Sequence, residues 1–295
     1  MIPTTIRTVL NPDCGRRRRL LKWGLLLFVL LAVAYPRPDR LVRNIVRWRN
    51  LDSLIDPDNP ALAPLAAEVA PRLEGVPPGP EALRIVEDYV LRRIPYAWDW
   101  ETWGVLDYVP TVEETLAVGR EDCDGRAVIA ASLLRRFGYD ASITSDLSHV
   151  WVRTSAGETM TPVRPASGGT IIAASIGGPT RINWAIVFNT ATLLKDVPTS
   201  LAYGIAVFPA WREAIVVLAL FLVLADREPR FRRELVAMAL IVAGWWVLRW
   251  TCGDAWNRSY AGAWTGYGLI AAGLAAMLWP PRRAASAEPA LVRAD

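Results

Sequence analysis

Two side chains in this sequence could together carry out nucleophilic catalysis. Cys123 lies in "GREDCDGRAVIAASLLRRFG", between three acidic residues and an apolar run. His149, the one histidine of the 295-residue chain, follows in "HVWV". A thiol beside an imidazole can attack a carbonyl carbon, because the imidazole removes the thiol proton. The pair therefore predicts covalent thiol chemistry, if the fold brings the two residues together.

The residues after Cys123 predict a helix that begins at or near the thiol. Small and apolar side chains recur there at helical spacing, and Gly138 is a typical C-cap: Ala127, Ala130, Ala131, Leu134 and Phe137. The unpaired N–H groups of a helix N-terminus stabilise a thiolate and lower the thiol pKa. The neighbouring acidic side chains oppose this effect unless they point away or cap the helix. We expect an activated thiol whose thiolate is populated near neutral pH.

The remaining cysteines argue for a free thiol and against a metal centre. Cys14 and Cys252 lie in other segments of the chain, so Cys123 has no disulfide partner in its own region. One histidine and three scattered cysteines lack the ligand spacing of a usual zinc site. We therefore expect neither a metal nor a cofactor.

The elements around the pair are predicted from shorter patterns. Residues 80–94 have apolar side chains at helical spacing, and Thr111 with Glu114 forms a capping box for a short helix that closes at Gly119. The segments "DASITS", "HVWVRT" and "ETMTPV" are typical of short strands, with a turn at 155–158. Helices followed by strands predict an α+β domain.

The segment "YVPTVEETLAVGREDCDGRAVIAASLLRRFGYDA" and the later "HVWV" resemble the transglutaminase-like superfamily, including its bacterial cysteine peptidase branch. The resemblance covers residues 80–162. It implies a papain-like α+β fold in which Cys123 is the nucleophile and His149 the general base.

The family pattern has a third member, usually an aspartate, on the strand after the histidine strand. A two-residue turn at Ala156–Gly157 would place this position at 161–164, where the sequence is "TPVR" and contains no carboxylate. The enzyme could then be slow, its histidine could be oriented by a backbone carbonyl, or the domain could be inactive. Tryptophans could line the cleft or donate an indole N–H to an oxyanion, although packing is the more common role: Trp98, Trp100 and Trp103. Arg126 is expected to be a solvated or capping residue.

Apolar segments place this chain in a membrane. The content of apolar residues is 53%, and four segments stand out, at 20–34, 201–225, 235–250 and 261–279. Arginines cluster at 16–19, 227–233 and 282–283, next to these segments, and the positive-inside rule then places residues 36–200 outside. We expect a multi-pass protein of the cytoplasmic membrane with an exoplasmic (periplasmic or extracellular) catalytic domain. Because the basic excess flanks the membrane segments, nucleic acid is not expected as a partner.

The predicted organisation has five parts. Residues 1–35 are a basic N-terminus with a signal anchor or a cleaved signal peptide. A helical lead-in covers 36–79 and the transglutaminase-like domain 80–200. Three transmembrane helices lie in 201–280, and a cytoplasmic tail in 281–295.

Two function classes follow from these features. The first is a membrane-anchored thiol enzyme that hydrolyses an amide or peptide, or transfers its acyl group, through an acyl-thioester on Cys123. The alternative is a catalytically inactive domain that binds peptides or proteins as a membrane module. The expected partners are a peptide or protein substrate and the lipid bilayer, and the sequence leaves the oligomeric state open.

Overall fold

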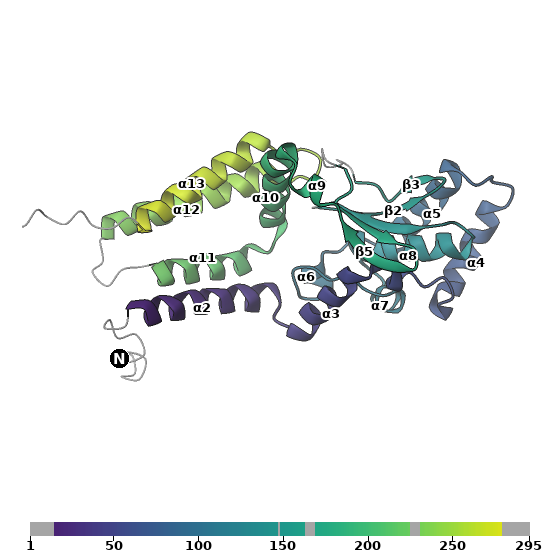
Figure 1. The fold of residues 1–295 in the computed structure, drawn as a ribbon, viewed down its shortest axis with the longest axis horizontal. Coiled ribbons are helices and arrows are strands. Elements are labelled where there is room, and N and C mark those ends of the chain that lie inside the picture. Colours follow the sequence, from purple (N-terminus) through teal and green to yellow (C-terminus); the bar gives the residue numbers. More distant parts are fainter. Residues whose placement is uncertain (1–14, 147, 163–168, 225–230, 279–295) are drawn as a thin grey trace, which may run out of the picture.

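The fold combines a bundle of long apolar helices with a mixed helix-and-sheet domain. The computed structural model describes residues 15–146, 148–162, 169–224 and 231–278. In Figure 1 the long helices extend from one end of the molecule and the sheet lies at the other. The structure is mostly helical, with one small antiparallel sheet.

Four long helices form the apolar part. The helix α2 (Gly15–Ala34) packs along α11 (Ala210–Leu224), and α12 (Phe231–Cys252) packs along α13 (Tyr260–Leu278) (Figure 1). The helices α12 and α13 are long and apolar enough to cross a membrane. Up to four spans result if two further bent helix pairs each count as one. This agrees with a membrane protein.

One predicted membrane helix differs from the structure. The segment 201–225 is divided into α10 (Val197–Val207) and α11, which meet at an angle of 109°. The bend lies at Phe208–Pro209, where Phe208 has an extended backbone (φ −64, ψ 150). Proline disfavours the helical conformation in the residue before it, so hydropathy alone overlooks this break. The helix α10 therefore lies across the end of the bundle, between the long helices and the sheet (Figure 1).

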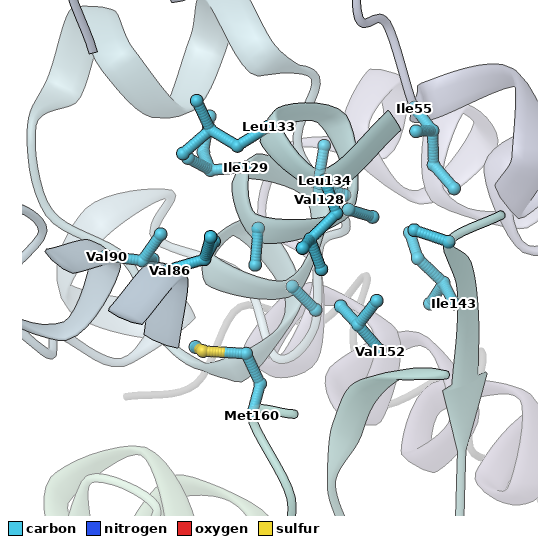
Figure 2. Close-up of a cluster of buried hydrophobic side chains, with 14 of the residues drawn as sticks. Ile55, Val86, Val90, Val128, Ile129, Leu133, Leu134, Ile143, Val152 and Met160 are labelled. Atoms are coloured by element: carbon cyan, nitrogen blue, oxygen red, sulfur yellow. The ribbon is translucent and has the colours of Figure 1, made fainter. Parts of the chain in front are cut away.

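The core of the sheet domain forms around α8 (Cys123–Arg136). The helix α5 (Pro80–Arg93) packs on one side of α8, and the strands pack on the other (Figure 2). Buried side chains of this core come from α5, α8 and the strands: Val86, Val90, Ile129, Leu133, Ile143 and Val152. The predicted lead-in also contributes buried side chains, among them Leu51 and Leu62. The remaining α-helices of this part are α3 (Pro38–Arg49), α4 (Ala63–Leu73), α6 (Asp99–Thr102), α7 (Val112–Val118) and α9 (Trp184–Val187), and short 3-10 helices cover Leu51–Leu54 and Pro60–Leu62.

The sheet has five antiparallel strands in the order β3-β2-β1-β4-β5. They are β1 (Ser142–Ser145), β2 (Val150–Thr154), β3 (Gly157–Thr159), β4 (Ile172–Ser175) and β5 (Gly178–Ile182). The first three confirm the predicted strands, whereas the sequence patterns did not predict β4 and β5. The strand β2 therefore lies inside the sheet, between β1 and β3.

The predicted register of the β2–β3 hairpin is wrong, because the two turn residues lie one position earlier in the chain than expected. The turn residues are Ser155 and Ala156, because Thr154 pairs with Gly157 and Val152 with Thr159. Gly157 (φ 134) begins β3 instead of forming the turn. The chain then leaves the ladder at Met160, before the segment 161–164 in which the third catalytic member was expected. Of that segment, Val163 and Arg164 lie outside the described residues.

Candidate functional site

The fold places Cys123 at the first residue of α8. The side chain of Asp122 caps this helix by accepting a hydrogen bond from the Asp124 N–H (3.1 Å). The third helical residue is Gly125, at which a Cβ would lie 2.4 Å from Cγ of Glu121 and 2.8 Å from Oγ1 of Thr115. Glycine is thus required for the close contact between α8 and the segment before it, and this contact fixes the position of the thiol.

His149 lies directly before β2 in a turn that Asp146 organises. The carboxylate of Asp146 accepts hydrogen bonds from the backbone N–H groups of Ser148 (2.7 Å) and His149 (2.8 Å). The backbone carbonyl of His149 in turn accepts from the Asp146 N–H (3.1 Å). The backbone on either side of the imidazole is therefore held by local hydrogen bonds.

A backbone carbonyl orients the His149 ring. Nε2 of His149 lies 2.7 Å from the carbonyl oxygen of Met160. A carbonyl oxygen only accepts, so Nε2 carries the proton and Nδ1 is the nitrogen that can act as a base. In the part of the chain that the structure describes, no carboxylate is hydrogen-bonded to this ring. This contact is the orientation by a backbone carbonyl, one of the three possibilities that the sequence left open.

Met160 has an unusual backbone conformation at this contact. Its φ is 58°, the one positive value at a non-glycine residue among those described. A left-handed conformation costs about 1–2 kcal/mol for an L-residue. Such strain is found where the surrounding structure imposes it, often at functional sites. The buried Met160 side chain packs into the core, and this packing helps hold the carbonyl toward His149.

Cys123 and His149 line the same cavity, which has a volume of about 830 Å³. The two residues are also linked through the backbone, because the N–H of Val150, next to His149, interacts with the Cys123 sulfur. Pockets of this volume are typical of sites for small ligands or substrate segments. The structure therefore brings the two predicted residues to one site.

The electrostatics of the thiol differ from the expectation of a readily ionised cysteine. Burial, followed by the charges of Asp122 and Asp124, raises the pKa of the Cys123 thiol well above its ordinary value. The thiol also donates a hydrogen bond to Oδ1 of Asp124 (3.3 Å). The effect of the helix N-terminus is thus outweighed, and Cys123 rests as a neutral thiol.

The imidazole is neutral as well. Burial lowers the pKa of His149, and the Met160 carbonyl and the charge of Asp146 oppose this shift only in part. A neutral imidazole in the same cavity as a neutral thiol has a free lone pair that can accept a proton. The resting pair is therefore a thiol and a base, and not a thiolate and an imidazolium.

Five acidic side chains gather beside the thiol: Asp99, Asp107, Glu121, Asp122 and Asp124. Burial raises the pKa of each of these carboxyl groups. Oxygens of Asp99, Glu121 and Asp122 lie within 4.8 Å of one another, as do those of Asp99, Asp107 and Asp124. Because like charges at this separation repel, the group must bind protons or a cation. Among the described residues, these carboxylate oxygens lie close enough together to hold a divalent metal ion, and so do the ligand atoms of Asp122, Cys123 and Asp124.

The predicted aromatic residues have different roles. Trp98 and Trp100 stack with ring centroids 4.7 Å apart and line the cavity. Trp103 is buried and donates its indole N–H to the Glu121 carboxylate, so this N–H is already occupied. Arg126 is half-buried, and it acts as a capping residue of a different helix, because Ile94 is the C-cap of α5. Its guanidinium donates to the carbonyl of Ile94 (2.8 and 3.0 Å) and lies over the Tyr96 ring.

No protein-family model, no curated protein and no solved structure matches this chain. The evidence for function therefore comes from the geometry of the site.

Sequence patterns did not predict the far wall of the cavity. This wall comes from α10 and its surroundings, including Leu201, Tyr203, Gly204 and Phe208. The ring of Tyr203 lies 6.1 Å from that of Trp98, and the ring of Phe208 lies 5.5 Å from that of Trp100. The sequence identifies Tyr203 as a candidate interfacial residue and Phe208–Pro209 as a helix break. Neither feature indicates a contact with the tryptophans near residue 100.

Proposed function

We propose that this protein is a membrane-anchored thiol enzyme, with a papain-like or transglutaminase-like arrangement, that cleaves or transfers an acyl group through a thioester on Cys123. The observation that carries this proposal is the shared cavity of Cys123 and His149, with the His149 ring oriented by the Met160 carbonyl. The motif order around both residues supports the same family of reactions. The substrate class is an amide or an ester, whose carbonyl carbon a thiol can attack.

The neutral resting pair suggests the order of proton transfers. Nδ1 of His149 takes the proton from Sγ as the sulfur attacks the carbonyl carbon. The N-terminal end of α8 stabilises the negative oxygen that forms, through its unpaired N–H groups and its dipole. Collapse of this intermediate breaks the bond to the leaving amine or alcohol, which takes the proton from His149. Water or an amine then attacks the thioester, gives a proton to His149, and releases the acyl product. The proton returns to the Cys123 sulfur.

The same proposal places the domain outside the cytoplasmic membrane. Clusters of arginine at 16–19, 227–233 and 282–283 support this orientation through the positive-inside rule. Exposed aromatic rings near the junction with the sheet domain are typical of a membrane–water interface: Trp184, Phe188, Trp256, Tyr260 and Trp264. The catalytic cavity would then open close to the outer surface of the bilayer.

A second candidate is the inactive binding module. The raised pKa of the Cys123 thiol and the lack of a hydrogen-bonded carboxylate at His149 among the described residues favour it. In this case the same cavity would bind a peptide or protein without forming a bond to sulfur.

Formation of the acyl-enzyme separates the two candidates. The full-length protein in detergent, with Cys14→Ser and Cys252→Ala, is incubated with 4-nitrophenyl acetate, and the mass of the Cys123 peptide is followed. We expect rapid acetylation of Cys123. His149→Gln should slow it by about 10²–10⁴-fold, the usual contribution of a general base. Glutamine can still donate to the Met160 carbonyl, so the variant tests the base and not the packing. Acetylation that is equally fast in both proteins would refute the enzyme and leave the binding module.

A further inference from the structure

The cavity at Cys123 has two chemically different ends. One end is polar and contains the thiol, His149 and buried carboxylates such as Asp122. The wall that α10 and the following bend contribute is mostly apolar, with Ser200 and Tyr203 among its residues: Leu201, Gly204, Ile205, Val207 and Phe208. A substrate that fills this cavity must therefore combine a reactive carbonyl with an apolar segment.

The apolar wall belongs to the membrane part of the protein. The helix α10 contacts α12 and α13 and continues through the bend into α11 (Figure 1). The cavity also reaches Glu213, in the first turn of α11, whose carboxylate pairs with Arg249 of α12 (2.8 Å). It thus extends from the thiol to the ends of the membrane helices.

An extended peptide would find few partners at this wall. Of the α10 side chains that line the cavity, only those of Ser200 and Tyr203 can form hydrogen bonds, whereas each buried peptide N–H and C=O group needs a partner. A peptide strand also cannot pair with the backbone next to His149, because β2 lies between β1 and β3 within the sheet. An alkyl chain has no such requirement and gains from burial.

On these grounds we infer that the substrate is an amide or ester that carries a long alkyl or acyl chain, and that this chain lies against α10 while the carbonyl reaches Cys123. This inference rests on the proposed function and specifies its substrate class. The chain can enter from the bilayer, since the wall is formed by a helix that joins the membrane helices. The stacked rings of Trp98 and Trp100, with Phe208 next to them, form the side of the passage between the two ends.

A matched pair of glycines allows a direct test. Gly204 lines the cavity, and a Cβ there would meet no atom within 4 Å. The same holds for a Cβ at Gly268 on α13, which does not line this cavity. Gly204→Phe should therefore fill the apolar end, whereas Gly268→Phe adds the same side chain to a helix elsewhere.

The probes are chloroacetamides with a short or a long substituent. Alkylation of Cys123 by N-ethyl and by N-dodecyl chloroacetamide is measured in the full-length protein in detergent. Because each buried methylene favours binding by about fourfold, we expect the long reagent to react at least about tenfold faster. Gly204→Phe should abolish this preference, whereas Gly268→Phe, which lies outside the cavity lining, should change neither rate. The long reagent partitions into detergent equally in the three experiments, so differences between the unsubstituted protein, Gly204→Phe and Gly268→Phe come from the protein.

Other outcomes separate the two proposals. A long-chain preference that Gly204→Phe leaves unchanged would overturn the lipid-chain inference, even where Cys123 forms an acyl-enzyme that depends on His149. A preference that is lost in Gly204→Phe, without an acyl-enzyme, would refute the enzyme but keep the chain site. If Gly204→Phe also loses the N-ethyl reaction, Leu201→Trp, at another exposed position of the same wall, replaces it. The rates of Cys123 acylation by 4-nitrophenyl dodecanoate and by 4-nitrophenyl acetate are then compared. A faster reaction of the dodecanoate places the alkyl chain in the acyl group of the substrate, and equal rates place it in the leaving group.

Discussion

The Asp124 carboxylate should keep Cys123 protonated, so Asp124→Asn should accelerate its alkylation. The sulfur and Oδ1 of Asp124 are 3.3 Å apart. At this separation, a thiolate and a carboxylate repel each other by about 1.3 kcal/mol in water and by about 5 kcal/mol at an effective dielectric constant of 20. Because about 1.4 kcal/mol corresponds to a tenfold change, even the lower figure raises the thiolate population about eightfold.

The assay is the rate of iodoacetamide alkylation between pH 6 and pH 10. The protein carries Cys14→Ser and Cys252→Ala, so only Cys123 reacts. Burial also raises the pKa of the Asp124 carboxyl group. The alkylation profiles of the wild-type protein and of Asp124→Asn should therefore coincide in acid, where Asp124 is protonated. They should separate as the pH rises through the pKa of Asp124. Asp140→Asn is the control. This carboxylate is exposed, accepts a hydrogen bond from the Ser155 N–H, and is not among the charges that raise the Cys123 pKa.

Two results would refute this reasoning. One is a wild-type profile whose midpoint lies below the ordinary thiol pKa, since burial and the two carboxylates should raise it. The other is an Asp124→Asn rate at pH 8–9 that equals the wild-type rate. The helix N-terminus would then control the thiol, as the sequence alone suggested.

Three further predictions concern stability and topology. Gly125→Ala should lower the free energy of unfolding by about 1–3 kcal/mol through overpacking, whereas Gly204→Ala should not, since its Cβ meets no atom within 4 Å; thermal unfolding of both variants checks this. Burial raises the folded-state pKa of Asp99, so its contribution to stability is present in acid and lost as the pH rises. Asp99→Asn should flatten the dependence of the melting temperature on pH between 5 and 8, and an unchanged slope would contradict this. In a cysteine-free background, Glu113→Cys should react with an impermeant maleimide in intact cells and Glu228→Cys should not; the opposite pattern would reverse the topology.

Local patterns in the sequence predict the elements that hold the two central residues. The capping box of Thr111 and Glu114 and the C-cap Gly119 are present in the structure. Cys123 begins its helix, as predicted, and His149, which was predicted as the first residue of a strand, directly precedes that strand. Each of these features depends on interactions over a few residues, which the order of residue types reveals.

Features that depend on distant contacts could not be predicted in this way. The far wall of the cavity requires contacts of Tyr203 and Phe208 with Trp98 and Trp100. The thiol pKa depends on burial and on the direction in which Asp124 points, which residue order does not specify. The contact with the Met160 carbonyl follows from a register and a backbone angle that differ from the simplest hairpin.

The position of α10 in the sequence determines when the site is completed during synthesis. Cys123 and His149 leave the ribosome before Tyr203, whose ring borders the cavity. At a rate of about 5–20 residues per second, the 80 residues from Cys123 to Tyr203 take roughly 4–16 s. During this interval the domain can fold around α8, but the apolar wall is missing. Newly made protein therefore contains the thiol before this wall of the cavity exists, and the cavity is complete only when α10 is in place.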